Sequence, residues 1–159
     1  MSTIINKRVT ARREGDFVVF LIGMRANKWW KFGKIATVAS AMGRMIKELE
    51  SKPESGFLGY EQWLGRTTIM VQYWESFEKL ETYANDRTGE HYPAWIDYYK
   101  KIKASDAAIG IWHETYKIAA QNYECVYANM PAFGLGKVSN LKPAEGHYQT
   151  AKQRIEEKK

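Results

Sequence analysis

The sequence predicts an α+β fold of the ferredoxin-like type, in which four strands and two helices follow the order βαββαβ and one extra strand comes after them. The first observation is size: 159 residues, 45% of them hydrophobic, suit one domain. The second is that strand-like apolar runs and helical stripes follow this order along the chain. The third is that the strand-like runs are apolar on both faces. We place the domain at residues 15–137, between a basic N-terminal arm at 1–14 and a polar C-terminal tail at 138–159.

The first half of the domain contains a strand, a helix and a hairpin. Residues 16–25 form a continuous apolar run rich in β-branched and aromatic side chains, which predicts a strand buried on both faces. Apolar residues then recur at helical spacing over 36–50, which predicts an amphipathic helix. The runs 57–64 and 67–74 are joined by only two residues, so they predict a tight hairpin.

The second half contains a broken helix and two strands. Ser76 is a candidate N-cap for a short helix, and Pro93 opens a second helical piece after a polar interruption. Residues 109–118 predict a strand, with His113 on one of its faces. Residues 123–128 predict a short fifth strand.

The two predicted helices can cover only one face of a four-stranded sheet. Because the strands are apolar on both faces, the second face must also be buried. Pairing with a second copy, sheet face against sheet face, achieves this with two-fold symmetry. We therefore expect a homodimer whose two sheets form a shared barrel-like core.

Composition argues against several functions. The net charge is +6, but much of the basic excess lies at the two ends of the chain, where charges aid solubility. Residues 26–34 interleave three lysines with three aromatic residues, but this loop is short and lacks a second basic stripe, so we expect no nucleic-acid partner. Cys125 is the only cysteine, which excludes an intrachain disulfide and cysteine-rich metal sites. No apolar segment reaches about 18 residues and no secretion signal is present, so we expect a cytoplasmic protein without a membrane partner.

A resemblance covers most of the chain, from residue 17 to about residue 142. It rests on the segments 23–30 (GMRANKWW), 64–68 (LGRTT), 72–74 (QYW), 91–95 (HYPAW) and 110–116 (GIWHETY). These segments resemble an uncharacterised bacterial family labelled "monooxygenase family protein", which is placed in the dimeric α+β barrel superfamily. The resemblance implies the same architecture as the element order and a homodimer that acts on a small molecule.

A second, weaker resemblance concerns the C-terminal part of the domain. The segments 113–116 (HETY), 123–124 (YE), 127–131 (YANMP) and 134–135 (GL) are similar to haem-containing aldoxime dehydratases. The resemblance implies that His113 is the axial ligand of a haem iron. Met130 stands where those enzymes have a distal catalytic histidine, so the acid–base chemistry of that position differs here.

Haem requires an axial donor, an apolar and aromatic pocket, and basic groups for its propionates. We therefore assign His113 as the metal ligand, Trp112 to the aromatic wall and Lys28 to a propionate. Met130 could be a second axial ligand, which would favour storage, sensing or electron transfer over catalysis.

For catalysis, the iron would act as a Lewis acid on a nitrogen or oxygen of a small substrate, with Asn129 and Arg25 as hydrogen-bond donors. The resemblance implies dehydration of an aldoxime to a nitrile. His91 is a third candidate catalytic residue, because it lies in the predicted helix break, where cofactor-free barrel monooxygenases place polar residues.

Two other functions remain open from the sequence. One is a cofactor-independent monooxygenase that holds an electron-rich substrate with His91 and with Trp and Asn side chains. The other is a haem- or ligand-binding protein without turnover. In the purely structural interpretation, His113 is a strand histidine that is hydrogen-bonded in the core or at the dimer interface.

Overall fold

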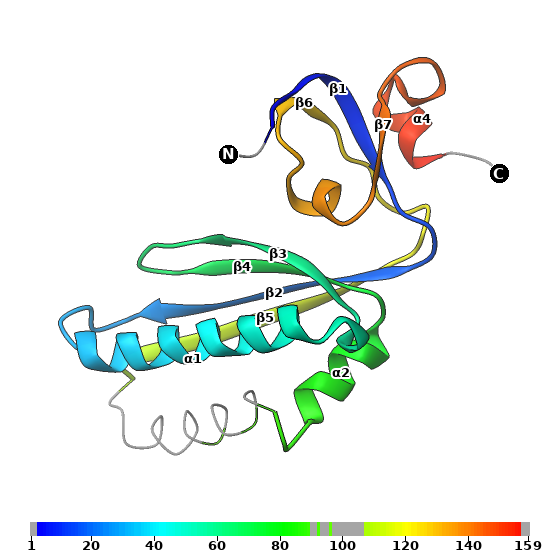
Figure 1. The fold of residues 1–159 in the computed structure, drawn as a ribbon. Helices are drawn as coiled ribbons and strands as arrows, with labels where there is room; N and C mark the ends of the chain where they lie inside the picture. The colour runs from blue at the N-terminus through cyan, green and yellow to red at the C-terminus, as the bar shows by residue number, and fades with distance from the viewer. Residues whose placement is uncertain (1–2, 90–91, 93–95, 97–106, 157–159) are drawn as a thin grey trace.

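The protein folds into two antiparallel sheets, which Figure 1 shows one above the other. The structure is a computed structural model that describes residues 3–89, 92, 96 and 107–156. The main sheet has the strand order β3-β4-β2-β5, with β2 (Phe17–Ala26), β3 (Phe57–Trp63), β4 (Ile69–Trp74) and β5 (Ile109–Ile118). The small sheet has the order β6-β1-β7, with β1 (Ile5–Arg12), β6 (Tyr127–Met130) and β7 (Asn140–Pro143).

The main sheet confirms the predicted ferredoxin-like fold class. All its strand pairs are antiparallel, and the helices α1 (Phe32–Ser51) and α2 (Phe77–Asn85) lie on one side of it (Figure 1). We call this side the helix face and the opposite side the open face. Short 3-10 helices occur at η1 (Pro53–Ser55), η2 (Gly134–Lys137) and η3 (Gly146–Tyr148). Among the described residues, no helix is both long enough and apolar enough to cross a membrane.

A core of buried side chains joins the helices to the helix face. Its members are Val18, Ile46, Leu49, Met70, Trp74 and Leu80. They recur at the spacings that place side chains on one face of a strand or helix, as the sequence predicts. Helix α2 begins at the predicted N-cap, since the Ser76 hydroxyl accepts a hydrogen bond from the Lys79 N–H at 3.2 Å. Helix α1 begins at Phe32 rather than at residue 36 and has no side-chain cap.

The extra strand differs from its prediction. It spans Tyr127–Met130 rather than residues 123–128, and it pairs with β1 in the small sheet. The helical piece expected from Pro93 lies outside the described residues, and so does His91.

The predicted arm and tail also differ, because they supply two of the three strands of the small sheet. Strand β1 is the middle strand, and its Thr10 and Ala11 are buried. The short helix α4 (Ala151–Ile155) follows β7, and its Arg154 is buried with Nε donating to Glu124 Oε2 at 2.7 Å. At least one of the basic residues near the C-terminus, Arg154, is therefore part of the folded structure. Lysine and arginine residues lie on both sides of the short buried segment of β1, so the sequence pattern did not predict a strand there.

The small sheet packs over one end of the open face. Ala11 from β1 and Leu135 from η2 form a core with Phe17 at the start of β2. Tyr73 and Val19 of the main sheet pack against the same core. The remainder of the open face lies beyond this contact.

Polar contacts fix the loop η2 on the main sheet. The Gly134 N–H donates to Glu61 Oε1 at 2.9 Å, and Lys137 Nζ forms an ion pair with the same carboxylate at 2.8 Å. The Gly136 N–H donates to the hydroxyl of Tyr127 at 3.1 Å. Burial raises the pKa of Tyr127 and of Tyr73, which keeps both phenols neutral as partners for the loop.

Candidate functional site

His113 lies on β5, the edge strand of the main sheet, opposite Ile22 of β2. Its imidazole is on the helix face, because Ile22 and Phe20 pack against the core on that face. The imidazole and Phe20 rings are 5.7 Å apart between centroids. The side chain is exposed, and no hydrogen bond or ion pair joins it to another residue in the described part of the chain. Neither ring nitrogen is engaged by a residue that the structure describes.

Strand alternation also identifies the other side chains beside His113. Ile111 and Thr115 share its face of β5, and Lys117 follows at the next position. The Lys117 ammonium lies 5.6 Å from the centre of the Phe77 ring of α2, which confirms that this row faces the helices. Lys117 is thus a basic group on the same face as His113, and it was not among the residues predicted from the sequence.

Trp112 lies on the opposite face of β5 from His113. It pairs with Gly23, and its indole Nε1 is 2.7 Å from the place where a Cβ on Gly23 would be. This Nε1 is buried and has no hydrogen-bond partner among the residues that the structure describes. The assignment of Trp112 to the wall of a pocket at His113 therefore needs correction, because successive strand residues point to opposite faces.

Asn129 and Met130 do not approach His113 within one chain. Both lie on β6, where Met130 pairs with Ile5 and Asn129 adopts a positive φ of 53°. The small sheet packs on the open face, whereas His113 is on the helix face, so the main sheet separates them. Met130 consequently cannot be the second axial ligand of an iron bound to His113 of the same chain. The reason is that β6 pairs with β1 rather than with the main sheet.

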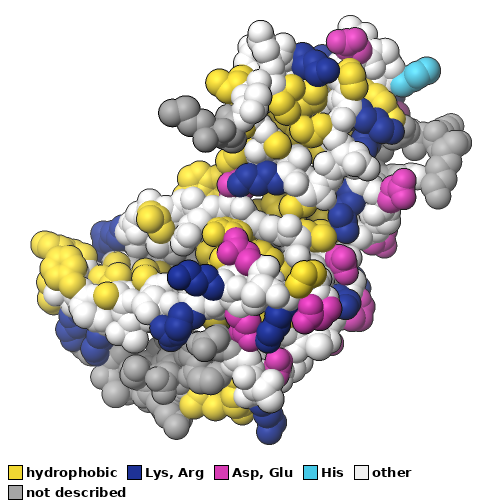
Figure 2. Space-filling view, viewed as in Figure 1, with side chains coloured by type: hydrophobic (Ala, Val, Ile, Leu, Met, Phe, Trp, Pro, Cys, Tyr) yellow, Lys and Arg dark blue, Asp and Glu magenta, His cyan; other side chains and the backbone are white. Residues whose placement is uncertain are grey.

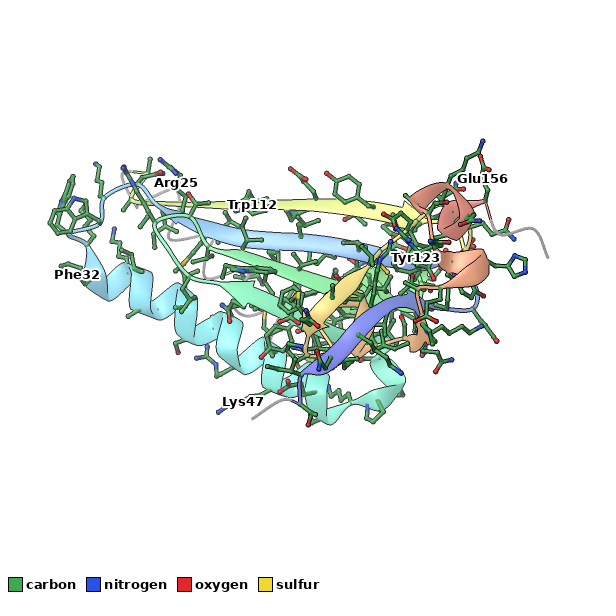
Figure 3. The ribbon with its side chains drawn as sticks, turned by 90° about the horizontal axis from the view of Figure 1, so that it is seen from above. Arg25, Phe32, Lys47, Trp112, Tyr123 and Glu156 are labelled. Carbon is green, nitrogen blue, oxygen red and sulfur yellow. The ribbon has the colours of Figure 1, made fainter. Side chains whose placement is uncertain are left out.

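Arg25 and Lys28 lie at the far end of β2. Figure 3 shows Arg25 and Phe32 at one end of the molecule and Tyr123 toward the other. Arg25 donates from Nη1 to Thr67 Oγ1 at 2.6 Å and pairs with Gly110, which puts its side chain on the open face. The Lys28 N–H donates to the Ala108 carbonyl oxygen at 3.1 Å. The structure therefore does not group Arg25 with His113.

A separate cavity of about 280 Å³ lies between α1 and the opposite edge of the main sheet. It is lined by Ala39, Met42, Gly43, Ile46, Lys47, Glu50, Tyr60, Gln62 and Met70. A smaller cavity of about 60 Å³ shares four of these residues. The larger cavity adjoins β3, whereas His113 lies on β5 at the opposite edge of the main sheet, so the larger cavity is distinct from the surroundings of His113.

Among the described residues, no group of three or more His, Cys, Asp or Glu side chains could hold a metal ion.

The topology of the main sheet defines an α+β protein of the ferredoxin-like class. The family model described as monooxygenase af470-like matches residues 17–135, which is most of the chain. The protein belongs to this family. No curated protein matches the chain.

Solved structures with a similar fold include two aldoxime dehydratases. One, in complex with butyraldoxime, has 12% sequence identity and a TM-score of 0.60, and the other has 14% identity and the same TM-score. They cover 97% and 94% of this chain, but the chain spans only 44% and 43% of theirs. A protein from Bacteroides thetaiotaomicron VPI-5482, described as a possible oxidoreductase, has 12% identity and a TM-score of 0.43 over 65% of this chain and 98% of its own. The likeness to the two aldoxime dehydratases establishes the shared fold.

Proposed function

We propose that the protein is a small-molecule enzyme that binds haem through His113. The observation that carries this proposal is the exposed imidazole on the helix face, which lies beside Phe20 and has no hydrogen-bond partner among the described residues. The side chains near His113 are of the types that bind haem. The imidazole is a donor for the iron, Phe20 and Ile22 are apolar contacts for the ring, and the Lys117 ammonium is a partner for a propionate. Bound haem would supply a Lewis-acidic iron for a nitrogen or oxygen of the substrate.

The residues of this chain would have separate roles at such a site. His113 would hold the group from a rigid strand, and Phe20 and Ile22 would exclude water from one side of it. Asn129 and Arg25 lie on the other side of the main sheet from His113, so we assign neither of them a contact with the bound group. His91 stays a candidate catalytic residue.

The test is a haemin titration of the purified protein followed by absorption spectroscopy. We expect a saturable Soret band at one haem per chain, which His113→Ala abolishes. His147→Ala is the matched control, since this exposed histidine lies on η3 beside the small sheet and should leave the band unchanged. Met130→Leu should also leave it unchanged. A band that survives in His113→Ala, or no saturable band in the wild type, would contradict haem binding through His113.

The second candidate function is cofactor-independent oxygenation, for which the cavity between α1 and β3 is the favouring observation. Its walls combine apolar side chains, such as Met42, Ile46 and Met70, with polar or charged groups at Gln62, Lys47 and Glu50. Such a cavity suits a compact organic substrate. If haemin does not bind, substrate-dependent oxygen consumption without added metal becomes the measurement that tests this function.

We also propose that the protein is a homodimer joined through the uncovered part of the open face. Trp63, Ile69 and Tyr116 are exposed there, although monomeric proteins seldom leave such a group of large apolar side chains on one sheet face.

Light scattering coupled to size exclusion should give twice the 18.4 kDa chain mass for the wild type. Ile69→Asp should give the mass of a single chain, because a carboxylate in the interface would lose its hydration. Ile155→Asp is the matched control, since Ile155 is 40% exposed on α4 and Ile69 is 37% exposed. A single-chain mass for the wild type, or equal effects of both changes, would contradict the proposed interface.

A further inference from the structure

The loop between β2 and α1 forms a protruding cluster that we call the aromatic tip. It consists of Trp29, Trp30 and Phe32, which are 60%, 58% and 66% exposed. The Trp29 ring contacts those of Trp30 and Phe32 edge to face, with centroids 6.1 and 6.0 Å apart. The three rings therefore pack on one another rather than in the core. Figure 2 shows an apolar cluster at this end of the molecule, with Lys and Arg side chains next to it.

The aromatic tip lies within a strongly basic part of the chain. Residues 17–47 include no Asp or Glu, and their Lys and Arg residues are Arg25, Lys28, Lys31, Lys34, Arg44 and Lys47. The first turn of α1 also lacks an acidic residue, so its partial positive charge adds to that of Lys34. The turn after β3 lies against the same end, because the Ala26 N–H donates to the Arg66 carbonyl oxygen at 2.8 Å. This turn adds the exposed Leu64 and the cation of Arg66.

We propose that the aromatic tip attaches the protein to the surface of an anionic lipid bilayer. Tryptophan rings favour the interface between lipid and water, and nearby cations are attracted to anionic headgroups. A compact projection of mutually packed rings suits shallow insertion into a bilayer. Single-stranded nucleic acid instead requires a basic groove along which successive bases stack. The proposal replaces the expectation of no membrane partner, which rested on the lack of a long apolar segment, because surface attachment needs none.

The test is co-sedimentation of the full chain with vesicles of phosphatidylcholine alone or of phosphatidylcholine and phosphatidylglycerol in equal amounts. We expect binding to the anionic vesicles only, and weaker binding as salt is raised. The double variant Trp29→Ala/Trp30→Ala should lower the affinity by at least about tenfold. Lys34→Gln should lower it by about fivefold, since one surface cation contributes that much near an anionic bilayer.

Matched changes elsewhere separate the tip from general charge and hydrophobicity. Ile155→Ala removes an exposed apolar side chain from α4, and Lys152→Gln removes a cation from the same helix. Both should bind the vesicles as the wild type does, and circular dichroism should show all variants folded. The proposal is overturned by no binding to anionic vesicles, by equal losses in the tip and control variants, or by tighter binding to a single-stranded oligonucleotide than to the vesicles.

Discussion

Replacing Trp74 with alanine is expected to lower the free energy of unfolding by about 3–5 kcal/mol. Trp74 on β4 has no exposed surface, and its ring lies 5.3 Å from that of Phe57 and 5.6 Å from that of Tyr83. Its Nε1–H donates to the buried Gln72 Oε1 at 3.0 Å. The alanine therefore leaves a cavity in the core and a buried acceptor without its donor. Chemical denaturation followed by far-ultraviolet circular dichroism measures the loss.

Two comparison variants separate the parts of this loss. Trp74→Phe retains most of the ring volume but not the donor to Gln72, so we expect a smaller loss of about 1–3 kcal/mol. Trp30→Ala removes an exposed ring and should change the free energy of unfolding by no more than about 0.5 kcal/mol. If Trp74→Ala and Trp30→Ala unfold at the same denaturant concentration, the helix-face core is not organised around Trp74.

Gly23→Ala is expected to destabilise the fold by about 3 kcal/mol, at the upper end of the cost of overpacking. A Cβ on Gly23 would lie 2.0 Å from the backbone oxygen of Thr68 and 2.7 Å from Trp112 Nε1. The Thr68 backbone cannot move away easily, because its N–H donates to the Met24 carbonyl oxygen at 2.8 Å and its hydroxyl accepts from the Met24 N–H at 3.0 Å. The methyl group must therefore separate β2 from the segment that leads into β4.

Gly43→Ala is the matched control for this substitution. Gly43 lies inside α1, and a Cβ on it would have no atom within 4 Å among the described residues apart from its chain neighbours and the adjacent helix backbone. Alanine should therefore stabilise the protein by about 0.5–1 kcal/mol, since glycine is a poor helix former. Denaturation midpoints of both variants measure the contrast. A neutral Gly23→Ala would show that β2 and the Thr68 segment are farther apart than the structure places them.

Side-chain periodicity was sufficient to predict the main sheet and its helices. The uninterrupted apolar run 16–25 corresponds to β2, and residues 109–118 correspond to β5. The same alternation places His113 and Trp112 on opposite faces of β5, as the structure shows. These features depend on neighbours a few residues apart, and the sequence contains that information directly.

The candidate site was less predictable, because it depends on which strands pair. The resemblance to aldoxime dehydratases suggested His113 and Met130 as two ligands of one iron. Pairing of β6 with β1 instead puts Met130 on the other side of the main sheet. Lys117 was not predicted for a related reason, since the packing of the paired β2 residues and the contact with Phe77 show that its row of β5 faces the helices.

The sequence by itself determined the ferredoxin-like order, the buried faces of its strands and helices, and the need to cover a second sheet face. Only the tertiary structure showed that the two ends of the chain meet in a small sheet over part of that face. Strand β1 pairs with residues more than a hundred positions away, and such pairing depends on complementary edges and docking contacts that no local pattern encodes. Local periodicity thus specified the elements, and long-range pairing decided which candidate residues could share a site.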